Sequence, residues 1–481
     1  MQEILIWLSS NAGSAVTTLF TINLLLIAVV ILFENRAPER TLSWLLVLFA
    51  FPVVGFVLYL FFGHNWHRPS YKKRLRQRQA IARWSVRAAE DVRKLHEQTD
   101  EPEVVLRGFA TRSTGVPYTE GNRVSILTDA QVTYPKLLHA IREAKRSIDL
   151  EYYIFRYDQI GKALLDLLKQ KAKQGIRVRL LVDGYGSLGL GHKCFRELRA
   201  AGVQASYFAP LITLFYFFKA NYRDHRKIVI VDEQTVFTGG INIGDEYLSK
   251  KPIGYWRDTH LMLHGPCVNQ FITLFEEAWF RTTGKGKSQE RPVQPVAPQG
   301  ERINVIASGP DSTWYAVERL YLEMINRATK SLKIQTPYFI PDPGIHDALV
   351  NAVLRGVDVQ LMLPRKTDAV LLRHVATTYL NRILKAGGTV FEYTKGFLHQ
   401  KVLIVDDRIA TIGTCNIDVR SFHLDFEVNV LLSDTPSVRH LLDDYEQDLR
   451  NCEELDYSGF LNRPYWRRIR ESVLRLIAPL L

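Results

Sequence analysis

The sequence predicts an α/β protein of two lobes that are related by an internal repeat and preceded by a two-helix transmembrane hairpin. Three observations predict it: two uncharged apolar stretches near the amino terminus, a strand-and-helix pattern that occurs twice, and a polar motif that ends the strand series of each copy. A chain of 481 residues is also too long for one ordinary core.

The two apolar stretches run from Ala15 to Phe33 and from Leu42 to Phe62. Each has about the 20 residues that a helix needs to cross a bilayer core. Pro52 and Gly55 interrupt the second stretch, but membrane helices tolerate both residue types. The connection from Glu34 to Thr41 is short enough to force an antiparallel hairpin. A cleaved signal peptide is the alternative, but neither a basic segment before the first stretch nor a small-residue cleavage site after it is present.

Basic residues predict the orientation of this hairpin. Six of them follow the second stretch, whereas the connecting loop holds Arg36 and Arg40. The positive-inside rule then places both termini and the large carboxy-terminal body in the cytoplasm. The same cluster binds anionic head groups, forms a solvated helix face, or does both. Its members are Arg68, Lys72, Lys73, Arg74, Arg76 and Arg78.

Composition narrows the class of protein. Apolar residues make up 47% of the chain, which argues against long-range disorder. The net charge of +12 favours an anionic partner, which is nucleic acid, an acidic lipid surface or a phosphorylated substrate. The four cysteines form no CxxC pair and no Cys/His cluster of zinc spacing, so we expect reduced thiols.

The internal repeat defines the body of the protein. Ala144 to Phe155 resembles Ala328 to Phe339, and each segment reads as a helix end that runs into a strand. Gly175 to Val182 and Gly356 to Leu363 both read as a glycine followed by a buried strand. Helical stretches from Gly161 to Gln174 and from Ile345 to Arg355 separate these strands. Alternating strands and helices indicate an α/β layered domain, here present twice.

The segment from Gly284 to Glu301 is rich in Lys, Gln, Pro and Gly without periodicity, which indicates a linker between the copies. The predicted organisation is a hairpin over 1–65, a basic juxtamembrane linker over 66–105, a first lobe over 106–283, the interlobe linker over 284–301 and a second lobe over 302–481.

Each copy ends its strands with the same polar motif. A His, a Lys two residues on and an Asp five further on are followed by a Gly and, three residues later, an Asn. A lone His-x-Lys would more often be structural, but two copies with identical spacing indicate function. The motif residues are His225, Lys227, Asp232, Gly239 and Asn242 in the first copy, and His399, Lys401, Asp406, Gly413 and Asn416 in the second.

This residue set suits phosphoryl transfer on a diester. The His and Lys of one copy project from the same face of a strand, and the Asn returns towards them after a turn at the Asp. A neutral imidazole can attack phosphorus, while Lys and Asn hold the non-bridging oxygens. A second imidazole can act as acid and base. Each copy supplies one imidazole, so two facing copies complete the site. No metal and no cofactor is required.

The paired motifs resemble those of the phospholipase D superfamily. The resemblance implies two phospholipase D-like lobes about a pseudo-twofold axis, with the site between them. It also implies an acidic residue downstream of each histidine that orients it: Asp258 in the first copy and Glu427 in the second. It gives Asp232 and Asp406 no direct catalytic role, so both are expected to be structural or supportive.

Further segments resemble bacterial cardiolipin synthases, among them 34–44, 221–227, 335–341 and 396–401. That resemblance implies a bacterial cell-membrane enzyme that converts two phosphatidylglycerol molecules into cardiolipin and glycerol through a phosphatidyl-histidine. It favours His225 as nucleophile and His399 as acid and base, although the near-symmetric sequence leaves the reverse open. Anionic lipids are the expected partners and nucleic acid is not; the sequence is silent on oligomeric state.

Two segments bear on lipid access. Leu211 to Phe218 is apolar and aromatic, and either dips into the membrane or forms a buried strand or lobe contact. Tyr465 to Leu481 mixes Arg with Trp, Val, Leu and Ile, and reads either as an interfacial amphipathic helix or as a helix packed on the second lobe.

Three other functions compete. A membrane-bound phospholipase D that hydrolyses phospholipids to phosphatidic acid fits the motifs equally well. A nucleic-acid phosphodiesterase fits the basic charge, but the anchor and the lack of a nucleic-acid motif argue against it. An inactive scaffold would show degraded motifs, and both motifs are intact.

Overall fold

The computed structural model describes residues 38–59, 101–209, 221–250, 253–286, 300–312, 314–433 and 435–475, together with a few single positions between 17 and 27. The chain divides into two compact units. One comprises Met1–Arg68 with Leu211–Asn221, and the other comprises Pro69–Pro210 with Tyr222–Leu481.

The described part of the smaller unit contains two short helices, α2 (Pro38–Ala50) and α3 (Pro52–Leu58). The second predicted span is therefore not one continuous helix. Phe51 breaks it with φ −137° and ψ 74°, because the residue before a proline is disfavoured in the helical region. Pro52 then begins α3, where the missing N–H costs nothing. Among the described residues, none of the helices is both long and apolar enough to span a bilayer.

Much of the first predicted span lies outside the described residues, as do the basic cluster between Arg68 and Arg78 and the apolar segment from Leu211 to Phe218. The transmembrane hairpin and its orientation therefore stay predictions.

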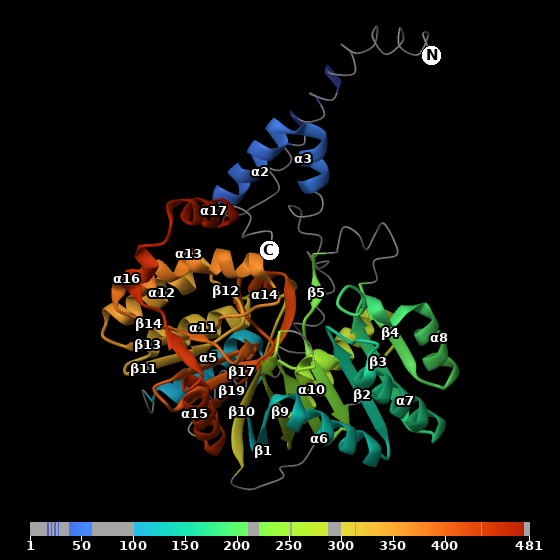
Figure 1. Ribbon diagram of the computed structural model, residues 1–481. Helices are drawn as coiled ribbons and strands as arrows, with labels where there is room; N and C mark the ends of the chain where they lie inside the picture. Colours follow the sequence, from blue (N-terminus) through green and yellow to red (C-terminus); the bar gives the residue numbers. More distant parts are fainter. Residues whose placement is uncertain are drawn as a thin grey trace, which may run out of the picture. The chain divides into compact units, whose positions relative to one another are not determined.

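The larger unit is built on one continuous sheet that is symmetric about its centre (Figure 1). β1 (Thr119–Thr128) and β10 (Glu301–Ser308) pair antiparallel in the middle. On one side the order continues β9-β7-β6-β2-β3-β4, and on the other it continues β19-β17-β16-β11-β13-β14-β20. The predicted repeat is therefore confirmed as two half-sheets with the same strand order.

The first half comprises α6 (Asp129–Glu143), β2 (Ser147–Tyr152), α7 (Gln159–Lys173), β3 (Arg177–Asp183), α8 (Gly191–Ala200), β4 (Gln204–Phe208), β5 (Arg223–Asp224), β6 (Lys227–Val231), β7 (Thr235–Gly239), β8 (Tyr255–Arg257), β9 (Thr259–His264) and α10 (Val268–Thr283). The predicted strand after Gly175 and the predicted helix from Gly161 are confirmed by β3 and α7.

The second half comprises α11 (Ala316–Arg327), β11 (Ser331–Gln335), β12 (Phe339–Ile340), α12 (Pro343–Leu354), β13 (Asp358–Pro364), α13 (Val370–Ala386), β14 (Thr389–Tyr393), β15 (Gly396–Leu398), β16 (Val402–Val405), β17 (Ile409–Gly413), β18 (Ile417–Asp418), α14 (Val419–His423), β19 (Asp425–Ser433), α15 (Pro436–Leu449), β20 (Cys452–Glu454), α16 (Tyr457–Leu461) and α17 (Tyr465–Arg475).

Both faces of the sheet are covered, so inner strands such as β6 and β16 are completely buried and contain the apolar runs Ile228–Val231 and Val402–Val405. One core belongs to each half: Leu150, Leu180 and Val229 lie in the first, and Ile334, Leu361 and Leu403 in the second. A third core under α10 joins them, since it contains Ile230 of the first half together with Ile404 and Val428 of the second.

The helix α5 (Pro102–Thr114) spans the predicted start of the first lobe, but its Leu106 and Ala110 lie in the core of the second half.

Two short strand pairs connect the halves. β5 pairs parallel with the start of β19, and β8 pairs parallel with β15. Each pair brings the residues just before one motif histidine beside the residues just before the acid of the other half. This exchange positions the site.

Candidate active site

His225 is held by a carboxylate of the opposite half. Its Nδ1 lies 2.9 Å from Oε1 and 3.1 Å from Oε2 of Glu427. The backbone fixes the approach, because the His225 N–H donates to the carbonyl of Phe426, the residue before Glu427, at 3.0 Å. His225 precedes β6 rather than lying within it. Both side chains are almost completely buried.

The second histidine has the same arrangement, with the two halves exchanged. His399 Nδ1 lies 2.7 Å from Oδ2 of Asp258, and the His399 N–H donates to the carbonyl of Arg257 at 2.7 Å. The predicted orienting acids, Asp258 and Glu427, thus do bind the histidines. The expected pairing within one copy is wrong, because the exchanged strands β5–β19 and β8–β15 place each acid beside the histidine of the other half.

These contacts decide which ring nitrogen is available. A carboxylate can only accept a hydrogen bond, so the Nδ1 of each imidazole carries a hydrogen and Nε2 is the ring atom that can react. Burial is the main cause that lowers the pKa of His225 to about 4; Glu427 opposes it, and Lys227 and Lys401 add to it. Burial and Lys401 likewise lower the pKa of His399. At neutral pH the ring of His225 is therefore uncharged.

The two motif lysines are buried beside their histidines. Lys227 Nζ donates to the carbonyl of His225 at 2.6 Å, and Lys401 Nζ donates to that of His399. Lys401 Nζ also lies 3.0 Å from the Nδ1 of His399. Burial lowers the pKa of Lys227 to about 7 and that of Lys401 to about 8. The positive charge of Lys401 also contributes to the lowered pKa of Lys227. A phosphate anion would restore both charges.

The two orienting acids stay ionised despite their burial. Burial alone would raise the pKa of Asp258, but Lys401 and His399 hold it below its usual value. Burial likewise opposes ionisation of Glu427, and His225 overcomes it. Thr414 O–H also donates to Glu427. The charges of Asp258 and Glu427 are thus each offset by cationic groups of the opposite half.

The motif aspartates lie at hairpin turns and bind backbone. Asp232, with φ 55°, accepts hydrogen bonds from the N–H groups of Lys145, Arg146 and Ser147, where α6 runs into β2. Asp406, with φ 51°, accepts from Thr329, Lys330 and Ser331 at the equivalent junction. Burial raises the pKa of both carboxyl groups, but these amides lower it more. In each half this carboxylate therefore fixes the junction between a helix and a strand.

The motif asparagines differ from each other. Asn242 is fixed from both ends, since its Nδ2 donates to the Tyr247 hydroxyl at 2.6 Å and its Oδ1 accepts from the Ile154 N–H at 3.1 Å. Asn416 is buried, and its Oδ1 accepts no hydrogen bond from the residues that the structure describes. Asn416 is therefore the better placed of the two to bind a substrate.

The small residues near each Asn make room for the acids. A Cβ at Gly240 would lie 2.0 Å from Asp258 Oδ1. The equivalent position of the second half is Thr414. Its side chain does not clash with Glu427, because its hydroxyl donates a hydrogen bond to that carboxylate. The glycine is therefore required where the shorter acid enters, and the two half-sites are not identical.

Sequence reasoning missed several residues of the site. The ring of Tyr153 lies edge-on to His225 at 4.9 Å, and that of Tyr338 lies edge-on to His399 at 6.5 Å. Arg257, next to Asp258, forms a buried ion pair with Asp448 at 2.8 Å. Tyr153 and Tyr338 each follow a strand of the repeat, β2 and β11. Their similar places in the two copies could have marked them as site residues. Nothing in the sequence points to Asp448.

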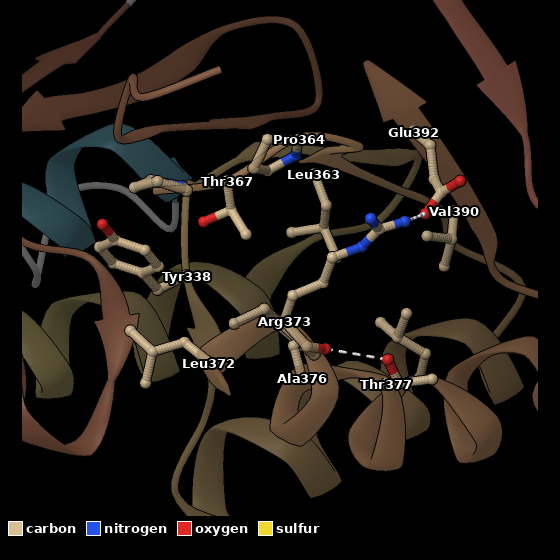
Figure 2. A pocket seen from close by; sticks show the side chains of 13 residues that line it. Tyr338, Leu363, Pro364, Thr367, Leu372, Arg373, Ala376, Thr377, Val390 and Glu392 are labelled. Atoms are coloured by element: carbon tan, nitrogen blue, oxygen red, sulfur yellow. Dashed lines mark hydrogen bonds and ion pairs between the residues drawn. The ribbon is translucent and has the colours of Figure 1, made fainter. Parts of the chain in front are cut away.

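A small hollow of about 40 Å³ lies beside Tyr338, between α13 and the ends of β13 and β14 (Figure 2). Tyr338, Thr367 and Leu372 line one part of it, and Arg373 lies across from them. Arg373 is paired with Glu392 at 2.9 Å, so its charge is already neutralised. None of the predicted site residues lines this hollow.

The family profile described as "Cardiolipin synthase, PLD-like domain" matches residues 137–279 and 321–449, one region in each half. The profile described as "Phospholipase_D-nuclease N-terminal" matches residues 21–64.

Relatives match over nearly the whole chain. The cardiolipin synthase of Alkalihalophilus pseudofirmus is 41% identical, over 99% of this chain and 95% of the relative. The major cardiolipin synthase of Bacillus subtilis is 40% identical, over 96% of this chain and 98% of the relative. Among solved structures, phosphatidylserine synthase from Haemophilus influenzae matches with a TM-score of 0.59 and 15% identity, over 78% of this chain and 98% of that one. At that identity the likeness shows the fold alone.

Proposed function

The chain belongs to the cardiolipin synthase family with paired phospholipase D-like domains, and from this premise we propose that it is a phosphatidyltransferase that makes cardiolipin. It transfers the phosphatidyl group of one phosphatidylglycerol to a second and releases glycerol. The observation that carries the proposal is the crossed arrangement of two buried imidazoles, each with its Nδ1 on a carboxylate of the other half.

In the first half-reaction, Nε2 of His225 attacks the phosphorus of phosphatidylglycerol. The bond from phosphorus to the glycerol oxygen breaks, and His399 gives its Nε2 proton to the departing alkoxide. The products are free glycerol and a phosphatidyl group bound to His225. Glu427 stabilises the positive charge that develops on the His225 ring, since it already holds Nδ1 at 2.9 Å.

In the second half-reaction, the roles of the same atoms reverse. His399, now neutral, removes the proton from a glycerol hydroxyl of a second phosphatidylglycerol, and that oxygen attacks the phosphorus. The bond from phosphorus to His225 breaks, cardiolipin leaves, and His399 is again protonated. The lysines Lys227 and Lys401 and the amide of Asn416 stabilise the non-bridging oxygens in both steps.

The differences between the half-sites favour His225 as nucleophile. Both oxygens of Glu427 lie within hydrogen-bond distance of its Nδ1, so the cationic adduct is stabilised by a complete carboxylate. His399 has Lys401 Nζ 3.0 Å from its Nδ1, and that nearby charge favours release of a proton. Release of a proton to the leaving group is the task of a general acid.

The deciding experiment is lipid product analysis of the purified full-length chain with labelled phosphatidylglycerol. Cardiolipin and glycerol from the wild type, and neither from His225→Ala or His399→Ala, support the proposal. Phosphatidic acid as the main product would instead assign a membrane phospholipase D, which uses water in the second half-reaction.

We also propose that the enzyme is bound to the bacterial membrane with its lobes in the cytoplasm. The profile match over residues 21–64 and the excess of basic residues after the second apolar stretch support this placement. Reporter fusions after residue 37 and after residue 481 test it: an active cytoplasmic reporter is expected at the second position only. If Leu211 to Phe218 enters the bilayer, Phe215→Ser with Phe217→Ser should reduce activity on vesicles and spare a soluble diester.

A further inference from the structure

We propose that Glu318, Asp342 and His423 form a structural binding site for one divalent cation in the second half, of the kind that takes mixed nitrogen and oxygen ligands. The three residues come from α11, from the amino-terminal end of α12 and from the end of α14. One donor atom of each lies within 4.8 Å of the other two. The site is separate from the catalytic histidines and takes no part in the proposed transfer.

Asp342 supplies the first indication of a ligand. It is the N-cap of α12, and its Oδ1 accepts the Ile345 N–H at 2.8 Å. Its Oδ2 is buried and accepts no hydrogen bond from any residue that the structure describes. The whole residue is only 8% exposed. A buried carboxylate oxygen without a donor is costly, and a cation is the partner that removes the cost.

The internal repeat provides a control. When Ala144 is aligned with Ala328, Asp158 is the residue equivalent to Asp342. Asp158 is likewise the N-cap of its helix, α7. There the second oxygen is satisfied, because Asp158 Oδ2 accepts the Asp245 N–H at 2.7 Å. Among the described residues of the second half no such donor reaches Asp342 Oδ2, and Glu318 and His423 lie beside Asp342 instead.

The same alignment explains Glu318. Its counterpart is Tyr134, whose hydroxyl donates to the carbonyl of Asn242 at 2.6 Å and so holds the segment after that asparagine. A carboxylate cannot donate such a bond. A cation held by Glu318, Asp342 and His423 would do the same work in the second half, by tying α14, which follows Asn416, to α11 and α12.

The geometry fits a metal better than a simple ion pair. His423 Nε2 lies 3.8 Å from Glu318 Oε2, which is too long for a hydrogen bond. The ring of Tyr315 lies edge-on to the imidazole at 4.4 Å and helps to set its orientation. One imidazole with two carboxylates suits Zn²⁺ or Mn²⁺, whereas Mg²⁺ and Ca²⁺ prefer oxygen ligands alone.

The test uses full-length protein in detergent, without an affinity tag, dialysed against a chelator. Reloading with Zn²⁺ or Mn²⁺ should restore about one equivalent of metal per chain by elemental analysis. It should also raise the Tm by at least about 3 °C when the metal is in large excess over its Kd. Mg²⁺ and Ca²⁺ should have a smaller effect.

Asp342→Asn is the sharpest variant, because Asn caps a helix as well as Asp but removes the ligand charge. It should lose both the bound equivalent and the Tm rise, and Glu318→Gln should do the same. The matched control, Asp158→Asn, should keep both. The proposal is overturned if none of the four metals raises the Tm of the wild type, or if the rise persists in Asp342→Asn. It is equally overturned if the Tm changes with pH but not with added metal. That result would mean that an ion pair of His423 with the two carboxylates, and not a cation, holds the three residues together.

Discussion

Nδ1 of His225 lies 2.9 Å from Oε1 of Glu427, although the two residues belong to opposite halves of the repeat. The reciprocal contact joins His399 to Asp258 at 2.7 Å. Neither half therefore contains a complete histidine–carboxylate pair of its own. The requirement for two copies extends beyond the number of imidazoles to the orientation of each one.

This crossing predicts that each carboxylate acts on the histidine of the other half. Glu427→Gln should slow formation of the covalent adduct on His225 by on the order of 10²–10⁴-fold, because an amide can donate to Nδ1 and favour the wrong tautomer. Rapid-quench labelling with radioactive lipid measures the rate. Glu427→Asp, which keeps the charge, should be less impaired. Equal rates for wild type and Glu427→Gln would contradict the assignment.

The two histidines should separate with an activated substrate. A diester with a p-nitrophenolate leaving group needs no acid, so His399→Ala should still release a burst of about one equivalent and then stall with a covalent adduct. His225→Ala should show no burst. Stopped-flow absorbance and mass spectrometry of the adduct check both results. A burst from His225→Ala alone would make His399 the nucleophile.

The pH dependence of kcat/KM should be shifted to acid. Burial lowers the pKa of His399, of Lys227 to about 7 and of Lys401 to about 8, and all three act as cations. Their charges are lost as pH rises through these lowered values. Neutral His225, with its pKa lowered to about 4, persists on the acid side. Rates in mixed micelles should therefore peak between about pH 4 and 7. A maximum above pH 8 would refute this account.

The motif aspartates should matter for stability rather than for chemistry. Asp232→Asn and Asp406→Asn each weaken a carboxylate that binds three backbone amides, at a cost of about 1–3 kcal/mol in the free energy of unfolding. Thermal unfolding should show a lower Tm for both variants. Activity at 20 °C should fall by less than about 3-fold. Loss of activity at unchanged Tm would assign these residues to the reaction.

The helix α17 should bind lipid with its outer face. Leu474 packs against the cluster of Ile340 and Val375, whereas Trp466, Ile469 and Val473 are 62%, 49% and 57% exposed. The sequence left two readings, an interfacial helix and a helix packed on the second lobe, and the observed packing is compatible with both. Replacement of the three exposed residues by Ser should weaken binding to anionic vesicles in flotation assays.

Leu354→Ser is the matched control for α17, because Leu354 is 69% exposed at the end of α12. This single change should leave vesicle binding unaltered. If it weakens binding as much as the triple substitution does, the effect belongs to general surface polarity and not to α17.

The repeated half-sheets and the identity of the site residues could be predicted because both depend on local pattern. Apolar runs such as 228–231 and 402–405 mark buried strands, and identical spacing marks the two motifs. The helix break at Phe51 also has a local cause, because Pro52 follows it. The prediction of one continuous span gave more weight to the apolar composition of the stretch than to this proline.

The sequence by itself determined the repeat, the strands and which histidines, lysines and acids form the site, since residue type and spacing specify them. Only the tertiary structure decided which acid binds which histidine. That choice rests on the pairing of β5 with β19 and of β8 with β15, contacts between segments far apart in the chain. Spacing along one strand carries no information about which strand of another half will lie beside it.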